Sequence, residues 1–169
     1  MHSRIVHTKK LGPLTIRPLR NGDVDTVGAL FDRLGPESRV RRFNAAKPQL
    51  SDHELAHLAR VDSRRHVLVA YVEGDPEPAG IAQLVRDASR CTHAEIAFAV
   101  ADRYHGRCVG SALVDLLAAD ARAAGVTHLT ATIQSSNRAA YSLVRKVARV
   151  IGVQHEAGEA AIVAAFEPA

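Results

Sequence analysis

The chain has 169 residues, the length of one domain and too few for two full hydrophobic cores. Hydrophobic residues make up 47% and charged residues 24%, which excludes wholesale disorder, and no apolar run reaches the roughly 18 residues that a membrane span needs. The net charge of +4 favours acidic partners, but aromatic residues are only 4% and the basic residues fall in small separate groups, which argues against nucleic acid. Only two cysteines, and a start without a signal-like apolar stretch, predict a cytoplasmic protein.

The first half of the chain is predicted to form one strand, three helices and a meander of strands. Alternating residues predict a strand at 14–19, and Asp23 is a good N-cap for a helix that ends near Gly35. Ser51 and Glu54 fit a capping box at the start of the third helix. The other elements of this half are helices at 37–43 and 51–60, strands at 66–72, 79–85 and 93–100, and an N-terminal arm over residues 1–13 that is either flexible or an extra edge strand.

The second half alternates helices and strands. A strong helix is expected at 109–124, where five residues form one apolar stripe and Gly125 ends the helix. The stripe consists of Leu113, Leu116, Leu117, Ala121 and Ala124. After it come a strand at 127–133, a helix at 136–147, and strands at 149–154 and 159–166. This order predicts an α/β (α+β) fold, in which a mixed sheet carries helices on both faces.

One exact short motif suggests a metal. His53, Glu54 and His57 spell HExxH on a predicted helix, the pattern in which two histidines bind zinc and the glutamate activates water. Against this, Ser63 stands where the elongated metalloprotease pattern has a third histidine. The capping box also gives Glu54 a structural role at the start of its helix. We therefore expect no metal at this motif.

The junction at 98–113 is the better candidate for a ligand site. It is basic, contains glycines and leads from a strand into a helix, whose N-terminus offers unpaired N–H groups and a positive dipole end to a phosphate. The segment from His105 to Leu113 resembles the acyl-CoA loop of the GNAT superfamily of N-acetyltransferases, which has the pattern Gln/Arg-x-x-Gly-x-Gly/Ala. Here His105 stands at the Gln/Arg position and Cys108 at the first glycine.

The resemblance extends over the predicted element order and implies a single acyl-CoA N-acyltransferase (GNAT) domain at 14–169. Such a domain has a mixed, mostly antiparallel sheet of about seven strands and uses acetyl-CoA as co-substrate without a metal. The residues it assigns to the pantetheine chain are Phe98, Ala99 and Val100, with Asn137 nearby, and those it assigns to the pyrophosphate are His105, Gly106, Arg107, Cys108, Val109, Gly110 and Ser111. Asn137 has the alternative role of helix cap.

The catalytic residues are less complete. Many family members carry a tyrosine that protonates the leaving thiolate, and Val144 stands at that position here, with Tyr141 about one turn earlier. An amine acceptor must lose a proton, so a base is required. Glu95 is our candidate, because it shares a strand face with the small residues Ala97 and Ala99, and similar enzymes use a glutamate on this strand. The alternative is an ion pair between Glu95 and Arg86.

The sequence therefore predicts an N-acetyltransferase that transfers an acetyl group directly from acetyl-CoA to an amine. The segments 37–43, 50–52 and 61–66 resemble those of bacterial protein-lysine acetyltransferases that modify acyl-CoA synthetases, which makes a protein lysine the expected acceptor. Two alternatives stay open: a non-catalytic CoA-binding regulatory module, and an acetyltransferase acting on a small amine. The oligomeric state is not predicted.

Overall fold

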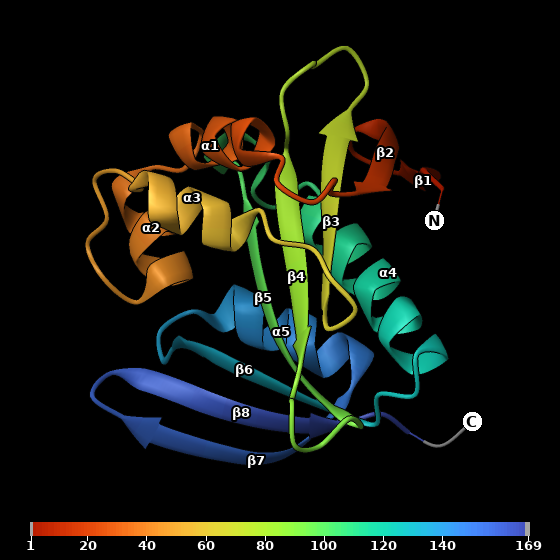
Figure 1. The fold of residues 1–169 in the computed structure, drawn as a ribbon, viewed down its shortest axis with the longest axis vertical. Helices are drawn as coiled ribbons and strands as arrows, with labels where there is room; N and C mark the ends of the chain where they lie inside the picture. Colours follow the sequence, from red (N-terminus) through yellow and green to blue (C-terminus); the bar gives the residue numbers. More distant parts are fainter. Residues whose placement is uncertain (1, 168–169) are drawn as a thin grey trace.

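The structure is a computed structural model that describes residues 2–167. Within this range, eight strands form one sheet in the order β1-β2-β3-β4-β5-β6-β8-β7, and only the β5–β6 pair is parallel (Figure 1). The strands are β1 (Arg4–Thr8), β2 (Gly12–Pro18), β3 (Arg65–Val72), β4 (Gly80–Arg86), β5 (His93–Val100), β6 (His128–Gln134), β7 (Arg149–Glu156) and β8 (Glu159–Ala165). The helices are α1 (Val24–Asp32), α2 (Pro36–Phe43), α3 (Asp52–Leu58), the short 3₁₀ helix η1 (Asp102–Tyr104), α4 (Val109–Ala123) and α5 (Arg138–Val147).

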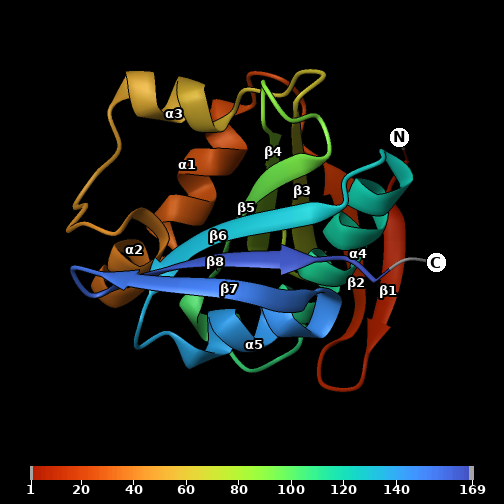
Figure 2. The same cartoon turned by 90° about the horizontal axis from the view of Figure 1, so that it is seen from below.

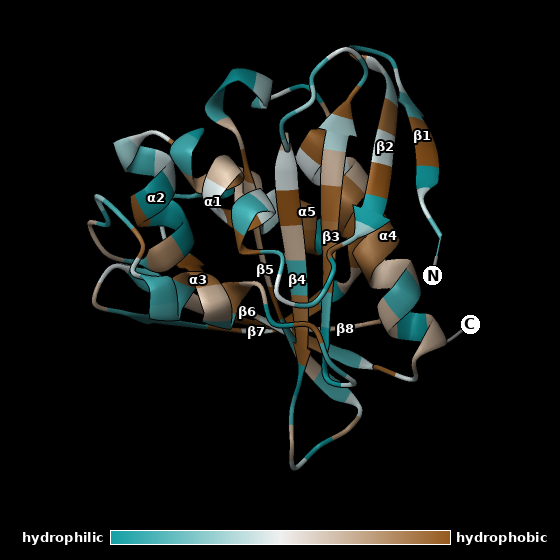
Figure 3. Ribbon diagram, turned by 45° about the horizontal axis from the view of Figure 1, so that its top comes forward, coloured by the Kyte–Doolittle hydropathy of each residue, from teal (hydrophilic) through white to brown (hydrophobic). Residues whose placement is uncertain are grey.

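Helices cover both faces of the sheet, as predicted. Helices α4 and α5 lie on one face and α1 to α3 on the other (Figures 1 and 2). Strand β3 shows the reason, because Leu68 packs into the larger core under α4 while its neighbours Val67 and Val69 pack into a smaller core on the opposite face. All three side chains are fully buried, and strand β3 needs apolar residues on both of its faces. In Figure 3, β3 and β4 carry several hydrophobic residues, whereas most of the α2 ribbon has the colour of hydrophilic residues.

The sheet has one strand more than the roughly seven expected. Of the two alternatives for residues 1–13, the structure shows the edge strand, at Arg4–Thr8, antiparallel to β2. Arg4 connects this strand to α4 through two hydrogen bonds of 2.7 and 2.6 Å to the Asp120 carboxylate, which also contacts Nε2 of His66 at 2.8 Å. Burial by itself would raise the pKa of Asp120, but the hydrogen bonds from Arg4 and His66 outweigh it, and the pKa is lowered.

The predicted stripe of α4 needs one correction. Leu113, Leu117 and Ala121 are buried against the sheet, and Leu116 is half-buried, as expected for one helical face. Ala124 is exposed, because it is the C-cap residue, where the chain turns away towards Gly125 at φ +81°. The other element boundaries lie within about two residues of the predicted ones, the usual uncertainty at frayed ends.

The sheet divides between β5 and β6. Their parallel pairing covers only three residue pairs, from His93–His128 to Glu95–Thr130. Beyond this point β5 continues along β4, and β6 continues along β8. Figure 1 shows the two strands diverging from their shared end. The backbone edge of β5 after Glu95 is therefore not covered by β6, and a cleft opens between the two strands.

None of the helices within residues 2–167 combines the length and the apolar character that crossing a bilayer requires.

Candidate functional site

A cleft of about 530 Å³ occupies the space where β5 and β6 separate, a volume typical of sites for small ligands. Strand β5 lines it from Ile96 to Val100, and β6 contributes Thr132 and Ile133. The loop before α4, the N-terminal half of α5, and the segment from Leu34 to Arg42 supply the other walls. Five separate parts of the chain thus converge on one cleft at the division of the sheet.

The loop at the mouth of the cleft has the geometry of an anion site. Gly106 and Cys108 adopt left-handed backbone conformations, with φ of +68° and +70°, and Cys108 is the N-cap of α4. The first backbone bond of the helix runs from the Ala112 N–H to the Cys108 carbonyl, at 3.0 Å. The N–H groups of the first turn, at Val109 and Gly110, have no intrahelical acceptor and are available to a phosphate.

Several contacts keep this loop in place. Nε2 of His105 contacts the Val100 carbonyl at 2.8 Å, and the Lys10 ammonium donates to the Gly106 carbonyl at 2.8 Å. Just upstream, the Tyr104 hydroxyl donates to Asp75 at 2.5 Å, and Arg33 donates to the same carboxylate at 2.7 Å. These bonds from Arg33 and Tyr104 lower the pKa of Asp75 to about 2, so the carboxylate stays charged. Through its bond with Tyr104, the Asp75 carboxylate anchors the start of the loop.

Gly110 is required for close packing inside the cleft. A Cβ atom at this position would lie 3.2 Å from Cδ1 of Leu143 on α5 and 3.3 Å from Cγ2 of Val100 on β5. Both neighbours line the cleft, so a larger side chain at Gly110 must either displace them or project into the cleft. Gly110, at the Gly/Ala position of the acyl-CoA loop pattern, therefore allows α4, α5 and β5 to approach one another here.

Cys108 occupies a backbone conformation that suits glycine better. A side chain at φ +70° is strained, so we expect Cys108→Gly to stabilise the protein by about 0.5–1 kcal/mol, which raises Tm by about 1–4 °C. Thermal unfolding measures this directly. The matched control is Cys108→Ala, which removes the thiol but keeps a Cβ atom, and which should bring no gain. An equal gain in both variants would show that the thiol, and not the backbone, is the source of strain.

The structure brings nearly all of the predicted cofactor residues together. Those that line the cleft are Phe98, Ala99, Val100, His105, Gly106, Cys108, Val109, Gly110, Ser111 and Asn137. Arg107 is exposed and is not part of the cleft wall. Asn137 also has the alternative role considered for it, because its side chain accepts a hydrogen bond from the Ala140 N–H at 3.1 Å and caps α5.

Glu95 lies at the point where the sheet divides. It is the last residue of β5 that pairs with β6, and Ile96 directly after it lines the cleft. Its side chain is exposed. The structure does not contain the alternative ion pair with Arg86, whose guanidinium instead donates to the carbonyls of Cys91 and Ala124 at 3.1 and 2.5 Å. The Glu95 carboxylate is therefore not neutralised by Arg86.

No tyrosine of α5 lines the cleft. Val144, at the position of the family tyrosine, is buried in the core, and Tyr141 packs at the edge of that core. Tyr104 does line the cleft, but its hydroxyl donates to Asp75, and burial together with this bond raises its pKa. Sequence reasoning missed Tyr104, although it directly precedes the predicted loop residue His105. It also missed Thr132 and Ile133, because nothing local marks a residue that a distant fold contact brings to a site.

The HExxH motif has a structural role. Ser51 and Glu54 form the predicted capping box, and Glu54 also pairs with Lys47. These bonds, that with Lys47 first, lower the pKa of Glu54 to about 2. Across residues 2–167, no group of three or more His, Cys, Asp or Glu side chains is arranged to hold a metal ion.

The fold and the site together define a class. A mixed sheet divided at its one parallel pair, with the N-terminus of a helix facing the division, is the architecture of N-acyltransferases that use an acyl-CoA loop. The sequence model of the acetyltransferase (GNAT) family matches residues 32–148, and the chain belongs to this family.

Individual relatives support this assignment. The chain is 31% identical over 137 residues to the acetyltransferase Pat of Mycolicibacterium smegmatis, a match that covers 80% of this chain and 40% of Pat. It thus spans well under half the length of this curated relative. The GNAT domain of S. lividans PAT superposes with a TM-score of 0.82 at 24% identity over 95% of both chains. yncA of Salmonella typhimurium, solved with its cofactor acetyl-CoA, superposes with a TM-score of 0.68 at 18% identity over 92% of this chain and 95% of its own. At these identities the two structures support the fold alone.

Proposed function

We propose that this protein is an acetyl-CoA-dependent N-acetyltransferase that transfers the acetyl group directly to the side-chain amine of a protein lysine. The observation that carries the proposal is the cleft at the division of β5 and β6, with the free N–H groups of α4 at its mouth. We infer that residues 14–169 form one catalytic domain, to which the segment 1–13 adds strand β1. The resemblance of segments 37–43, 50–52 and 61–66 to bacterial protein-lysine acetyltransferases supports a protein acceptor over a small amine.

The chain offers fitting groups for each part of the co-substrate. The N–H groups of Val109 and Gly110 would hold the pyrophosphate, because a helix N-terminus favours negative charge. The uncovered edge of β5, around Phe98 and Ala99, would pair its backbone with the pantetheine amides, and Asn137 also lines the cleft. Acetyl-CoA supplies the activated acetyl group.

Glu95 would act as the base. A lysine amine has a reference pKa near 10.4 and must lose a proton before it attacks a thioester, so a carboxylate at the division of the sheet can accept this proton directly or through water. A backbone N–H of β5 near Phe98 would stabilise the oxyanion that forms. Catalysis does not require a tyrosine acid at the Val144 position. A thiol with a reference pKa of about 8.5 is already a fair leaving group as the thiolate, without a proton donor.

The competing function is a CoA-binding module without catalysis, in which Cys108 and Val144 are marks of a degenerate site. The exposed Glu95 carboxylate, not paired with Arg86, favours catalysis over this alternative. Mass spectrometry of candidate acyl-CoA synthetases incubated with the protein and acetyl-CoA distinguishes the two. Acetylated lysines are expected, and their complete absence in every candidate, despite CoA binding, would favour the binding module.

Binding of acetyl-CoA should be measurable as stabilisation. A ligand at 100 times its Kd stabilises the folded state by about 2.7 kcal/mol, which for a chain of this size raises Tm by about 5–10 °C. ATP at the same concentration, which shares the adenine and the phosphates but not the pantetheine chain, is the control and should have a much smaller effect. No shift with millimolar acetyl-CoA, together with no heat in calorimetry, would overturn the proposed function.

A further inference from the structure

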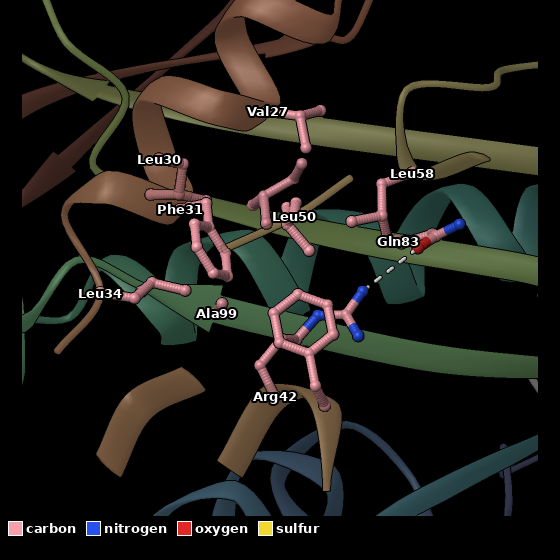
Figure 4. Close-up of a pocket in the computed structure, with 11 residues that line it drawn as sticks. Val27, Leu30, Phe31, Leu34, Arg42, Leu50, Leu58, Gln83 and Ala99 are labelled. Carbon is pink, nitrogen blue, oxygen red and sulfur yellow. Dashed lines mark hydrogen bonds between the residues drawn. The ribbon is translucent and has the colours of Figure 1, made fainter. Parts of the chain in front are cut away.

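A second cavity lies beside the cleft, between the α1–α3 segment and strands β4 and β5 (Figure 4). Its volume of about 30 Å³ has room for roughly two water molecules. Its walls are apolar, with side chains such as Val27, Phe31 and Leu58, except for two polar residues, Arg42 and Gln83. The Arg42 side chain is half-buried at the edge of this cavity, so its charge is partly desolvated, and such a charge is costly unless it is paired.

Arg42 has few partners of its own. Its Nη2 donates to Oε1 of Gln83 at 3.4 Å, a long bond to a side chain that is itself buried (Figure 4). The guanidinium also stacks on the Phe43 ring, with Cζ 5.1 Å from the ring centroid. Among residues 2–167, no other hydrogen bond and no carboxylate within 4.0 Å accompanies its five N–H donors. Burial lowers the pKa of Arg42, and the more distant Glu95 carboxylate opposes this only in part.

Neighbouring arginines do not share this situation. Arg41, the preceding residue on α2, pairs with the Glu37 carboxylate at 2.5 Å and is more exposed. Arg33, at the end of α1, pairs with Asp75 at 2.7 Å. Arg42 therefore differs from both in lacking a bonded anion.

Arg42 stands where the two cavities meet. Arg42, Leu34 and Ala99 line both the small cavity and the cleft. Gln83 pairs in register with Ala97, and Ile81 pairs with Ala99, so the polar end of the small cavity lies against the stretch of β5 that we assign to acyl transfer. A carboxylate attached close to the reacting atoms of a substrate would reach the guanidinium there.

We propose that Arg42 and Gln83 form a carboxylate-binding subsite beside the acyl-transfer centre. The carboxylate belongs either to the acyl group of the donor, as in a CoA thioester of a short dicarboxylic acid, or to the amine acceptor. The guanidinium would supply two parallel N–H donors, and the Gln83 amide would orient it. This inference rests on the proposed function, since it places the subsite relative to the acyl-transfer centre.

The donor is tested by calorimetry with succinyl-CoA and butyryl-CoA, whose acyl groups have the same number of carbon atoms and differ in the terminal carboxylate. The wild type is expected to bind succinyl-CoA about 10-fold more tightly or better, the worth of one charged hydrogen-bonded pair. Arg42→Gln should remove this preference and bind acetyl-CoA within a few-fold of the wild type, which also shows that the variant is folded. Arg41→Gln, which removes the same charge from the preceding residue, where it is paired with Glu37, should keep most of the preference.

The acceptor is tested by initial rates at saturating acetyl-CoA with a lysine peptide that carries an aspartate beside the lysine and with the matching asparagine peptide. The ratio of the two kcat/KM values is compared between wild type and Arg42→Gln, so that the different basicities of the two amines cancel. A ratio that falls about 10-fold or more in the variant assigns the carboxylate to the acceptor.

The outcomes separate the two proposals. If the wild type shows no carboxylate preference in either experiment, or if Arg42→Gln retains it, the subsite is wrong while acetyl-CoA binding leaves the proposed function intact. If acetyl-CoA and succinyl-CoA both fail to bind, the proposed function fails and the subsite fails with it.

Discussion

Glu95→Gln is expected to lower the rate of acetyl transfer about 100- to 10,000-fold, the range for one acid–base group, and to leave the affinity for acetyl-CoA almost unchanged. Glutamine keeps the shape of the side chain but cannot accept a proton at neutral pH. Glu95 is exposed at the division of the sheet and outside the cofactor wall, so its loss should act on chemistry rather than on binding. The measurement is the initial rate of CoA release with a lysine acceptor.

The pH dependence distinguishes a base from a residue that only positions the acceptor. Raising the pH should partly rescue Glu95→Gln, because a growing fraction of the acceptor amine arrives already neutral. The control is Tyr141→Phe, which should have little effect because Tyr141 does not line the cleft. Equal rates in wild type and Glu95→Gln would remove Glu95 as the base. A large loss in Tyr141→Phe would show that a tyrosine acid acts after all.

Gly110→Glu is expected to weaken acetyl-CoA binding by about 100-fold or more. The new side chain must displace Leu143 and Val100, which both line the cleft, or project into the cleft itself, because even a Cβ atom at this position lies within 3.3 Å of both. Negative charge and volume would then occupy the place assigned to a pyrophosphate, and like charges in a confined site repel strongly. Calorimetric titration with acetyl-CoA measures the loss.

The matched variant Gly110→Ala separates volume from charge. An alanine requires its two neighbours to move by only a few tenths of an ångström, so the variant should bind acetyl-CoA within roughly 10-fold of the wild type. Circular dichroism confirms that both variants are folded. Normal binding by a folded Gly110→Glu would mean that the phosphates bind at a different loop.

Much of the fold could be predicted from signals between residues that are close together in the sequence. The caps at Asp23 and Ser51 and the stop at Gly125 are local chemistry, readable from neighbours in the sequence, and each forms as predicted. The cofactor residues from Phe98 to Ser111 could be predicted from the sequence for the same reason, because a strand, a loop and the start of a helix are contiguous in the chain. The family resemblance carried the step from this junction to acetyl-CoA.

Only the tertiary structure decided what surrounds this junction. How far β5 pairs with β6, and therefore where the cleft opens, depends on how α4 packs on β3 to β5 and α5 on β6 and β7, and no local spacing encodes the stop at Glu95. In the sequence, nothing distinguishes Arg42 from the other charged residues of a polar helix. It becomes a half-buried cation only because α2 packs against β5 and β6 and brings it to Gln83, 41 positions away in the chain. Such contacts depend on which distant surfaces become desolvated together, and a side chain's partners and charge state are set by that burial.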